Sequence, residues 1–100
     1  MRKWPELLLA WSVPHTERNG TTLVARADAV ACLERVYLEG CRFYGYDSFT
    51  ISPEGWIQPF LEWSPSWEAQ AAPPLAELVD TIRVHPPEIT HYEFVFESAA

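Results

Sequence analysis

Prolines and glycines divide this chain into short segments, and this division limits the folds that it can adopt. Two proline pairs, Pro73-Pro74 and Pro86-Pro87, and two turn sequences, Asn19-Gly20 and Ser52–Gly55, interrupt the chain of 100 residues. Proline lacks the backbone donor that a helix or ladder needs, and glycine readily adopts turn conformations. Each segment between these breaks therefore has the length of one helix or one strand, and the whole chain, residues 1–100, has the size of a single domain.

Two of these segments have the spacing of amphipathic helices. The first is predicted from Asp28 to Glu39, with Asp28 as a capping residue and Gly40 at its end; its apolar residues are Val30, Leu33, Val36 and Tyr37. The second follows Pro73-Pro74 and ends at Pro86-Pro87, with Leu75, Leu78, Val79 and Ile82 at helical intervals.

Four other segments alternate or are rich in β-formers, and we expect strands at Leu7–Val13, Arg42–Ile51, Trp56–Trp63 and Ile89–Glu97. Pro59 within the third of these indicates an edge strand or a bulge. A polar connection is expected at His15–Asn19. Thr21–Ala25 is either a short extra strand that forms a hairpin with the first strand or the lead-in to the helix.

The order β-α-β-β-α-β is that of a ferredoxin-like α+β fold, in which two helices pack on one face of a four-stranded antiparallel sheet. The main alternative is another α+β arrangement with the extra strand at Thr21–Ala25. The face beneath the helices is expected to carry Leu9, Trp11, Phe43, Phe49, Ile57, Leu61, Phe94 and Phe96.

The opposite sheet face is then expected to carry aromatic and acidic side chains together. The central hairpin contributes Tyr44, Tyr46, Trp56, Gln58, Phe60 and Glu62, and the last strand adds His91, Glu93 and Glu97. Such a surface suits a protein partner, because aromatic rings supply contact area and carboxylates supply register. The same aromatics could instead be covered by a loop at Ser64–Ala72 or by a second copy of the chain.

The charge of the chain is uneven. Residues 1–42 carry six basic and five acidic side chains, whereas residues 43–100 carry nine acidic side chains and Arg83 as the one basic residue. An acidic field repels phosphate backbones and attracts basic surfaces. We therefore expect a basic protein partner and no direct binding of nucleic acid.

Few features of the sequence point to chemistry. The histidines His15, His85 and His91 lack metal-site spacing, there is no Cys-x-x-Cys, and no nucleophile motif or glycine-rich phosphate loop occurs. We expect no catalytic residue, metal or cofactor. Cys32 and Cys41 are expected to be reduced structural thiols, and the absence of a leader-like or membrane-spanning run predicts a cytoplasmic protein that does not bind membranes.

Two neighbouring stretches, Gly45–Phe49 and Gly55–Trp63, resemble the central segment of small bacterial immunity proteins of polymorphic toxin systems. The resemblance covers under a quarter of the chain. Together with the anti-CRISPR and other anti-defence proteins of phages, such proteins are small acidic binders without catalytic residues. The resemblance implies a protein inhibitor that blocks a nuclease toxin or a CRISPR effector.

The leading functional prediction is therefore a non-catalytic inhibitor that binds a basic surface. Its predicted partner-binding residues are Tyr44, Tyr46, Trp56, Phe60, Glu62, Glu93 and Glu97. One alternative is a small dimeric ferredoxin-like enzyme or ligand-binding domain with Trp11, Tyr44 and His91 in its pocket. A third is an accessory subunit of a larger assembly. A closed apolar pocket would favour the ligand-binding alternative over the inhibitor.

Overall fold

The computed structural model describes residues 2–68 and 71–99, and it shows an α+β fold. Three helices, α1 (Trp4–Ala10), α2 (Arg26–Leu38) and α3 (Leu75–Arg83), accompany one antiparallel sheet in this described part. The sheet strands are β1 (Thr16–Arg18), β2 (Thr21–Ala25), β3 (Arg42–Ile51), β4 (Ile57–Phe60) and β5 (His91–Glu97). A 3₁₀ turn, η1 (Leu61–Trp63), follows β4.

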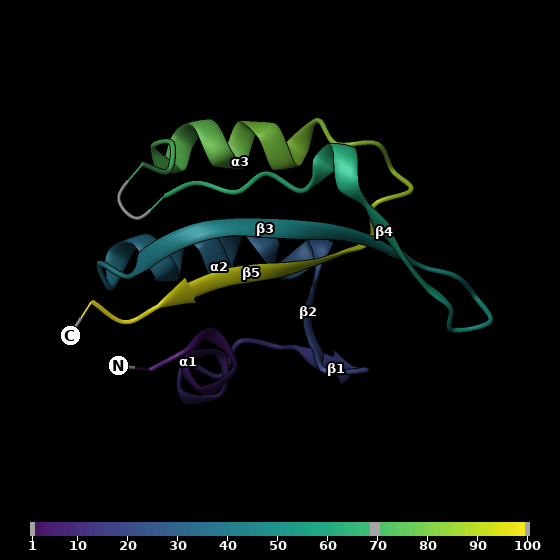
Figure 1. Ribbon diagram of the computed structural model, residues 1–100, viewed down its shortest axis with the longest axis horizontal. Helices are drawn as coiled ribbons and strands as arrows, with labels where there is room; N and C mark the ends of the chain where they lie inside the picture. The colour runs from purple at the N-terminus through teal and green to yellow at the C-terminus, as the bar shows by residue number, and fades with distance from the viewer. Residues whose placement is uncertain (1, 69–70, 100) are drawn as a thin grey trace.

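The strands lie in the order β1-β2-β5-β3-β4, and β3 and β5 form the long central pair (Figure 1). A flat sheet of this order would hold its two edge strands about 19 Å apart, at about 4.8 Å per strand. However, the Arg18 guanidinium at the end of β1 donates a hydrogen bond of 2.9 Å to the Gly55 carbonyl in the β3–β4 turn. The sheet is therefore strongly curved, and its two edge hairpins meet at their tips.

The first segment of the chain is a helix, and the strand predicted at Leu7–Val13 is wrong. Pro5 lies in the first turn of α1, where its fixed φ and missing donor favour helix initiation. The consecutive residues Leu7 and Leu8 are both buried, as suits a helix but not an alternating strand. A short continuous apolar run does not separate helix from strand by periodicity, which explains the error.

The polar connection predicted at His15–Asn19 contains β1, which pairs with β2 through the Asn19-Gly20 turn. Asn19 and Gly20 both have positive φ, 51° and 79°, as tight two-residue hairpins require. The extra strand at Thr21–Ala25 is confirmed, and it joins the sheet by pairing with β5. The sheet has five strands, and helix α1 occupies the segment that was predicted to be the first strand. The structure therefore does not show the four-stranded ferredoxin-like arrangement.

Both predicted long helices are present, with small shifts at their ends. Helix α2 begins at Arg26 with Ala25 as its N-cap, so Asp28 lies in the first turn and does not cap the helix. At its other end Gly40 has a φ of 66°, and the Cys41 amide donates to the Val36 carbonyl. Helix α3 follows Pro74, which is its N-cap, and ends at Arg83.

The core lies between α2, α3 and the inner face of the sheet, which we define by the paired residues Phe43–Phe96, Tyr46–Phe94 and Ser48–Tyr92. Helix α1 packs beside β5 and adds Leu7 and Leu8 to the same core, while Trp11 stacks on Phe96 at 5.8 Å. Phe43, Phe94 and Phe96 are buried as predicted. Leu9 and Leu61 are exposed, and Phe49 and Ile57 lie on the other face, so these four assignments to the core are wrong.

Candidate protein-binding face

The candidate site is the sheet face opposite the core, and a bulge in β3 decides which residues it contains. The pairing of β3 with β5 slips between Phe43 and Gly45, so one extra residue is inserted into β3. The alternation therefore changes phase at this point, and Tyr44 and Tyr46 lie on opposite faces. Gly45 itself has a φ of 147°, and a Cβ there would lie 2.4 Å from the Pro65 carbonyl oxygen. Only glycine fits where the chain segment around Pro65 approaches β3 so closely.

We name this surface the open face and define it by the β3–β5 pairs Arg42–Glu97, Gly45–Val95, Asp47–Glu93 and Phe49–His91, together with Tyr44. Apart from Gly45, every one of these residues keeps part of its side chain accessible to solvent. Apolar and ionisable groups alternate along the surface: Tyr44, Val95 and Phe49 are interleaved with Asp47, Glu93 and Glu97. The aromatic and acidic surface that the sequence predicts is therefore present, although several of its members differ.

Asp47 and Glu93 are the central feature of the open face, because two carboxylates occupy directly opposed positions of an antiparallel pair. Opposed side chains in such a pair have Cβ atoms about 4.5–5.5 Å apart, and like charges there are destabilising. Partial burial raises the pKa of Asp47. Among the described residues, the ion pairs are Arg2–Glu6, Arg35–Glu39 and Arg42–Glu97, so neither Asp47 nor Glu93 is neutralised by a basic side chain.

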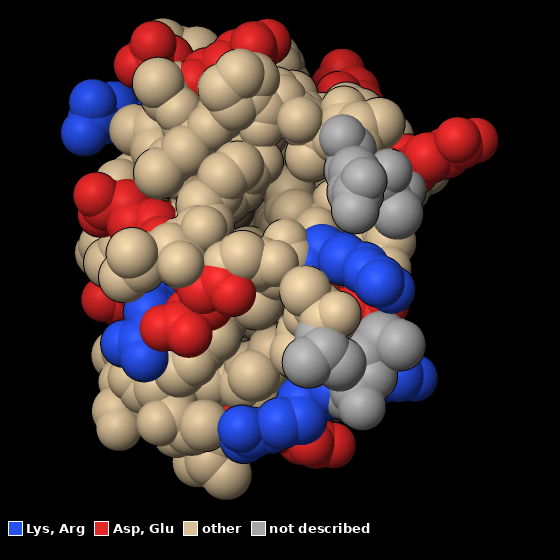
Figure 2. All heavy atoms as spheres, turned by 90° about the vertical axis from the view of Figure 1, so that its left-hand side faces the viewer, with Lys and Arg blue, Asp and Glu red and all other residues tan. Residues whose placement is uncertain are grey.

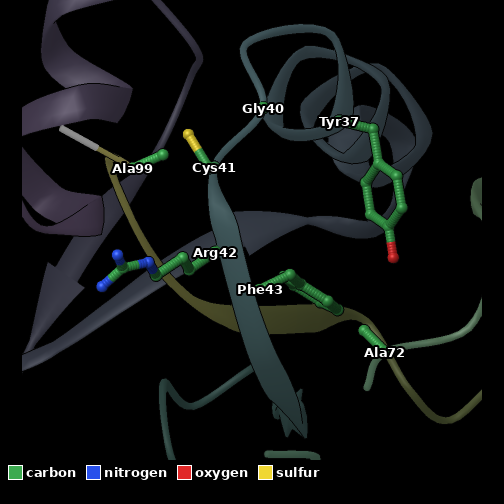
Figure 3. A pocket seen from close by; sticks show the side chains of 7 residues that line it. All are labelled: Tyr37, Gly40, Cys41, Arg42, Phe43, Ala72 and Ala99. Atoms are coloured by element: carbon green, nitrogen blue, oxygen red, sulfur yellow. The ribbon is translucent and has the colours of Figure 1, made fainter. Parts of the chain in front are cut away.

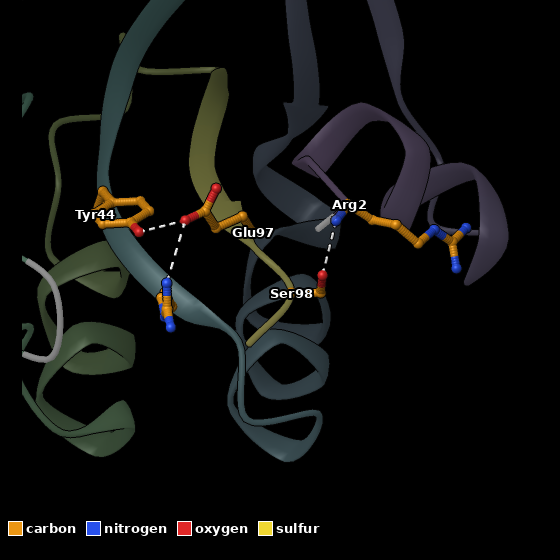
Figure 4. A network of polar contacts seen from close by, with 5 residues as sticks. Arg2, Tyr44, Glu97 and Ser98 are labelled. Atoms are coloured by element: carbon orange, nitrogen blue, oxygen red, sulfur yellow. Dashed lines mark hydrogen bonds and ion pairs between the residues drawn. The ribbon is translucent and has the colours of Figure 1, made fainter. Parts of the chain in front are cut away.

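Two carboxylates of the open face, those of Glu97 and Glu93, are held by neighbouring groups. The Tyr44 hydroxyl donates a 2.6 Å hydrogen bond to Glu97 Oε1, and the Arg42 guanidinium lies 3.9 Å from the same oxygen (Figure 4). The hydrogen bond to Glu97 raises the pKa of Tyr44, with smaller contributions from burial and from the Glu97 charge, while Arg42 opposes the shift. Glu93 Oε2 accepts the Thr22 amide at 2.8 Å. These contacts fix the orientation of Tyr44 and of both glutamates.

Four of the predicted partner-binding residues lie elsewhere than predicted. Tyr46 is only 2% exposed and Phe60 packs against the core, because the bulge and the β3–β4 register turn both side chains inward. Trp56 lies in the β3–β4 turn, where it is 75% exposed, and Glu62 is exposed in η1, where β4 has already ended. Tyr44, Glu93 and Glu97 remain on the open face as predicted.

The described part of the segment that follows η1 lies along the edge of β3. The Tyr46 amide donates to the Pro65 carbonyl, and the Trp67 amide donates to the Tyr44 carbonyl. The Trp67 ring then lies on the core side, 6.4 Å from the Tyr46 ring. The described part of the predicted loop Ser64–Ala72 therefore buries Tyr46 but leaves Tyr44 partly exposed; residues 69–70 of this loop lie outside the described ranges.

Arg18 lies beside the open face at its His91 end. Burial, and secondly the Arg18 charge, lowers the pKa of His91. A hollow of about 550 Å³ lies between the two hairpin tips and is lined by Glu17, Arg18, Asn19, Gly55, Trp56 and Ile57. Exposed Trp56 therefore stands at the rim of the open face.

Two further hollows are shallow and lie away from the centre of this face. One of about 370 Å³ is lined by Tyr37, Gly40, Cys41, Arg42, Phe43, Ala72 and Ala99 (Figure 3). Another of about 140 Å³ includes His91 with His15 and Asp28. Of the predicted pocket residues Trp11, Tyr44 and His91, only His91 lines one of these three hollows, and Trp11 lies against Phe96 in the core.

Charges of both signs are interspersed at the end of the molecule that holds the two termini (Figure 2). Within the described ranges, there is no group of three metal-ligating side chains and no helix long and apolar enough to cross a membrane. Both cysteines are free.

Sequence reasoning missed Asp47, Phe49 and Val95 as members of the open face. Gly45 within a strand is a known signal of a bulge or of close backbone approach, and it could have corrected the phase of β3. With the phase changed after Gly45, Asp47 and Phe49 fall on the face of Tyr44.

Neither a protein-family model, nor a curated protein, nor a solved structure matches this chain.

Proposed function

We propose that this protein is a non-catalytic binding module that docks a basic protein surface onto its open face. The single observation that carries this proposal is the opposed pair Asp47–Glu93, which no basic side chain of the described chain neutralises. Native sheets avoid such pairs because the repulsion costs stability, and departures of this kind concentrate at functional sites. A lysine or arginine of a partner placed between the two carboxylates would pair with both of them.

The surroundings of this pair suit a protein partner. Phe49 and Val95 flank the carboxylates with apolar surface, and Tyr44 is held in place by Glu97. Rigid aromatic anchors surrounded by orienting charges are typical of protein interfaces. Trp56 at the rim offers a further exposed ring that is suited to stacking against a guanidinium group.

In its more specific form, the proposal is that the chain is an inhibitor of a nuclease toxin or of a CRISPR effector. Enzymes of this kind present cationic grooves to phosphate backbones, and the Asp47–Glu93 pair would occupy phosphate positions in such a groove. The acidic excess beyond Arg42 supports this form, since it steers the chain toward a basic surface over a distance. The sequence resemblance to immunity proteins agrees with it.

The test compares two double variants with matched changes. Asp47→Lys with Phe49→Ala alters the open face, and Glu77→Lys with Leu38→Ala makes an equivalent change at exposed positions of α3 and α2. Each immobilised protein is exposed to lysate of the source cells. We expect the wild type and the control to retain the same basic protein, the face variant to retain at least about tenfold less, and retention to fall as salt rises.

Equal retention by the two double variants would refute the open face as the docking surface. If the retained protein is a nuclease, a second assay measures its cleavage rate with increasing amounts of the chain. The inhibitor form predicts loss of cleavage at one equivalent of wild type. Full cleavage at saturating wild type would reject inhibition while leaving binding intact.

A further inference from the structure

His85 lies in a closed aromatic box at the end of α3, on the side of the sheet away from the open face. Its side chain is 4% exposed. The ring centroids of Trp63, Tyr92 and Tyr46 lie 5.1, 5.8 and 6.0 Å from that of the imidazole. His85 Nδ1 is 2.9 Å from the Tyr92 hydroxyl, and Nε2 is 3.5 Å from the Tyr46 hydroxyl. The imidazole therefore joins α3 to both central strands and to η1.

The box suits a neutral imidazole. A neutral ring has one donor and one acceptor, so it accepts from one tyrosine hydroxyl and donates to the other. A protonated ring donates at both nitrogens, and the hydroxyl that had donated to it then loses its acceptor. An unsatisfied buried hydroxyl and a buried charge are both costly.

The charged surroundings add to this cost. The groups that face the ring are Tyr46 from β3, Tyr92 from β5, Trp63 from η1 and the cation Arg26 from α2. The charged residues close to His85 in the chain, Arg83 and Glu88, are exposed. In the described part of the chain no carboxylate bonds to the imidazole, so a protonated ring would have a cation nearby and no counter-ion.

We propose that the His85 box is an acid-triggered latch, in which protonation of the imidazole releases the end of α3 and η1 from the sheet. Release lets the charged ring reach water and uncovers the aromatic inner face around Tyr46. The latch is a property of the fold and does not depend on the proposed binding function.

The direction of the pH effect follows from the closed state. Burial, and secondly Arg26, lowers the pKa of His85 below the usual 6.5. The closed form therefore binds a proton less readily than the open form. Closure is fully stable above about pH 6.5, weakens as pH falls toward the pKa of the closed form, and changes no further below it.

The test is amide hydrogen exchange followed by NMR between pH 7.5 and 4.5, expressed as protection factors. For a single proton, protection of the last turn of α3 should be constant above about pH 6.5 and then fall by up to roughly tenfold per pH unit until the pKa of the closed form is reached. Amides of β3 and β5 should keep their protection. His85→Gln keeps a neutral hydrogen-bonding side chain and should abolish the dependence, whereas the matched His91→Gln should retain it.

A direct titration keeps the proposal testable even if His85→Gln does not fold. The His85 ring proton signals of the wild type should titrate at lower pH than those of a histidine in a short unfolded peptide. The latch is overturned if His85 titrates at the peptide's value or above it. It is also overturned if protection of α3 stays constant, or falls together with that of β3 and β5.

Discussion

Replacing Arg26 by methionine should cost this protein a large part of its stability. The Arg26 guanidinium lies under the end of α3, where Nη1 donates to the carbonyls of Pro86 at 2.7 Å and Ile89 at 3.1 Å. Nη2 donates to those of Ile82 at 3.1 Å and His85 at 2.7 Å. A helix end leaves carbonyl groups without internal partners. Arg26 binds one carbonyl of the last turn of α3, that of Ile82, together with three carbonyls of the segment that follows the helix.

The expected loss follows from these four bonds. A hydrogen bond to a charged group contributes about 1.5–3 kcal/mol, but bonds made by one side chain are not additive, so we expect Arg26→Met to cost about 3–5 kcal/mol. Domains of this size are stable by only about 5–15 kcal/mol. Arg26→Lys keeps the charge without the planar fork and should lose about 1–3 kcal/mol.

Urea unfolding followed by circular dichroism measures these differences, provided that the dependence on urea concentration is the same for all variants. Arg83→Met is the matched control, since Arg83 is exposed on α3 and its loss should change stability by less than about 0.5 kcal/mol. If Arg26→Met costs no more than Arg83→Met, the carbonyl contacts do not hold the end of α3, and the reasoning fails.

Two further predictions concern the bulge and the thiols. Gly45→Ala should lower the free energy of unfolding, measured in urea, by about 2–4 kcal/mol, because the added Cβ meets the Pro65 carbonyl. Gly20→Ala is the control, since Gly20 has a positive φ but lies in open space, and it should lower the free energy of unfolding by about 1–2 kcal/mol. Equal losses in the two variants would contradict the close approach at Gly45. Burial raises the pKa of the Cys32 thiol to about 12. The pKa of the half-buried Cys41 is also raised, by burial and secondly by the Glu39 charge. Cys41 should therefore react first with a thiol reagent and Cys32 only on unfolding, whereas equal rates in the native protein would show that Cys32 is accessible.

The elements that sequence reasoning placed correctly are those with long periodic patterns or clear breaks. Helices α2 and α3 lie between prolines and glycines, and β3 begins and ends as predicted. Helix α1 was mistaken for a strand because five consecutive small or apolar residues, Leu7–Trp11, fit either period. Pro5 is a local signal for the start of this helix, but the packing of the helix against β5 and the core follows from no local pattern.

The sequence predicts that one sheet face carries aromatic and acidic side chains, but it predicts only some of the residues on that face correctly. Tyr44, Glu93 and Glu97 follow from simple alternation along the strands. Tyr46 does not, because a single inserted residue reverses every later side chain of the strand. The opposition of Asp47 and Glu93 requires the β3–β5 register, which joins segments almost 50 residues apart and is set by the whole fold.

The central claim, that the open face docks a basic protein, is tested most directly by photo-crosslinking in the source cells. Benzoylphenylalanine replaces Phe49 on the open face in one variant and Ala76, which is exposed on α3, in the other. We predict that the Phe49 variant forms an adduct with a basic protein and that the Ala76 variant does not. Adducts formed from Ala76 alone, or from Phe49 to a second copy of this chain, would contradict the claim.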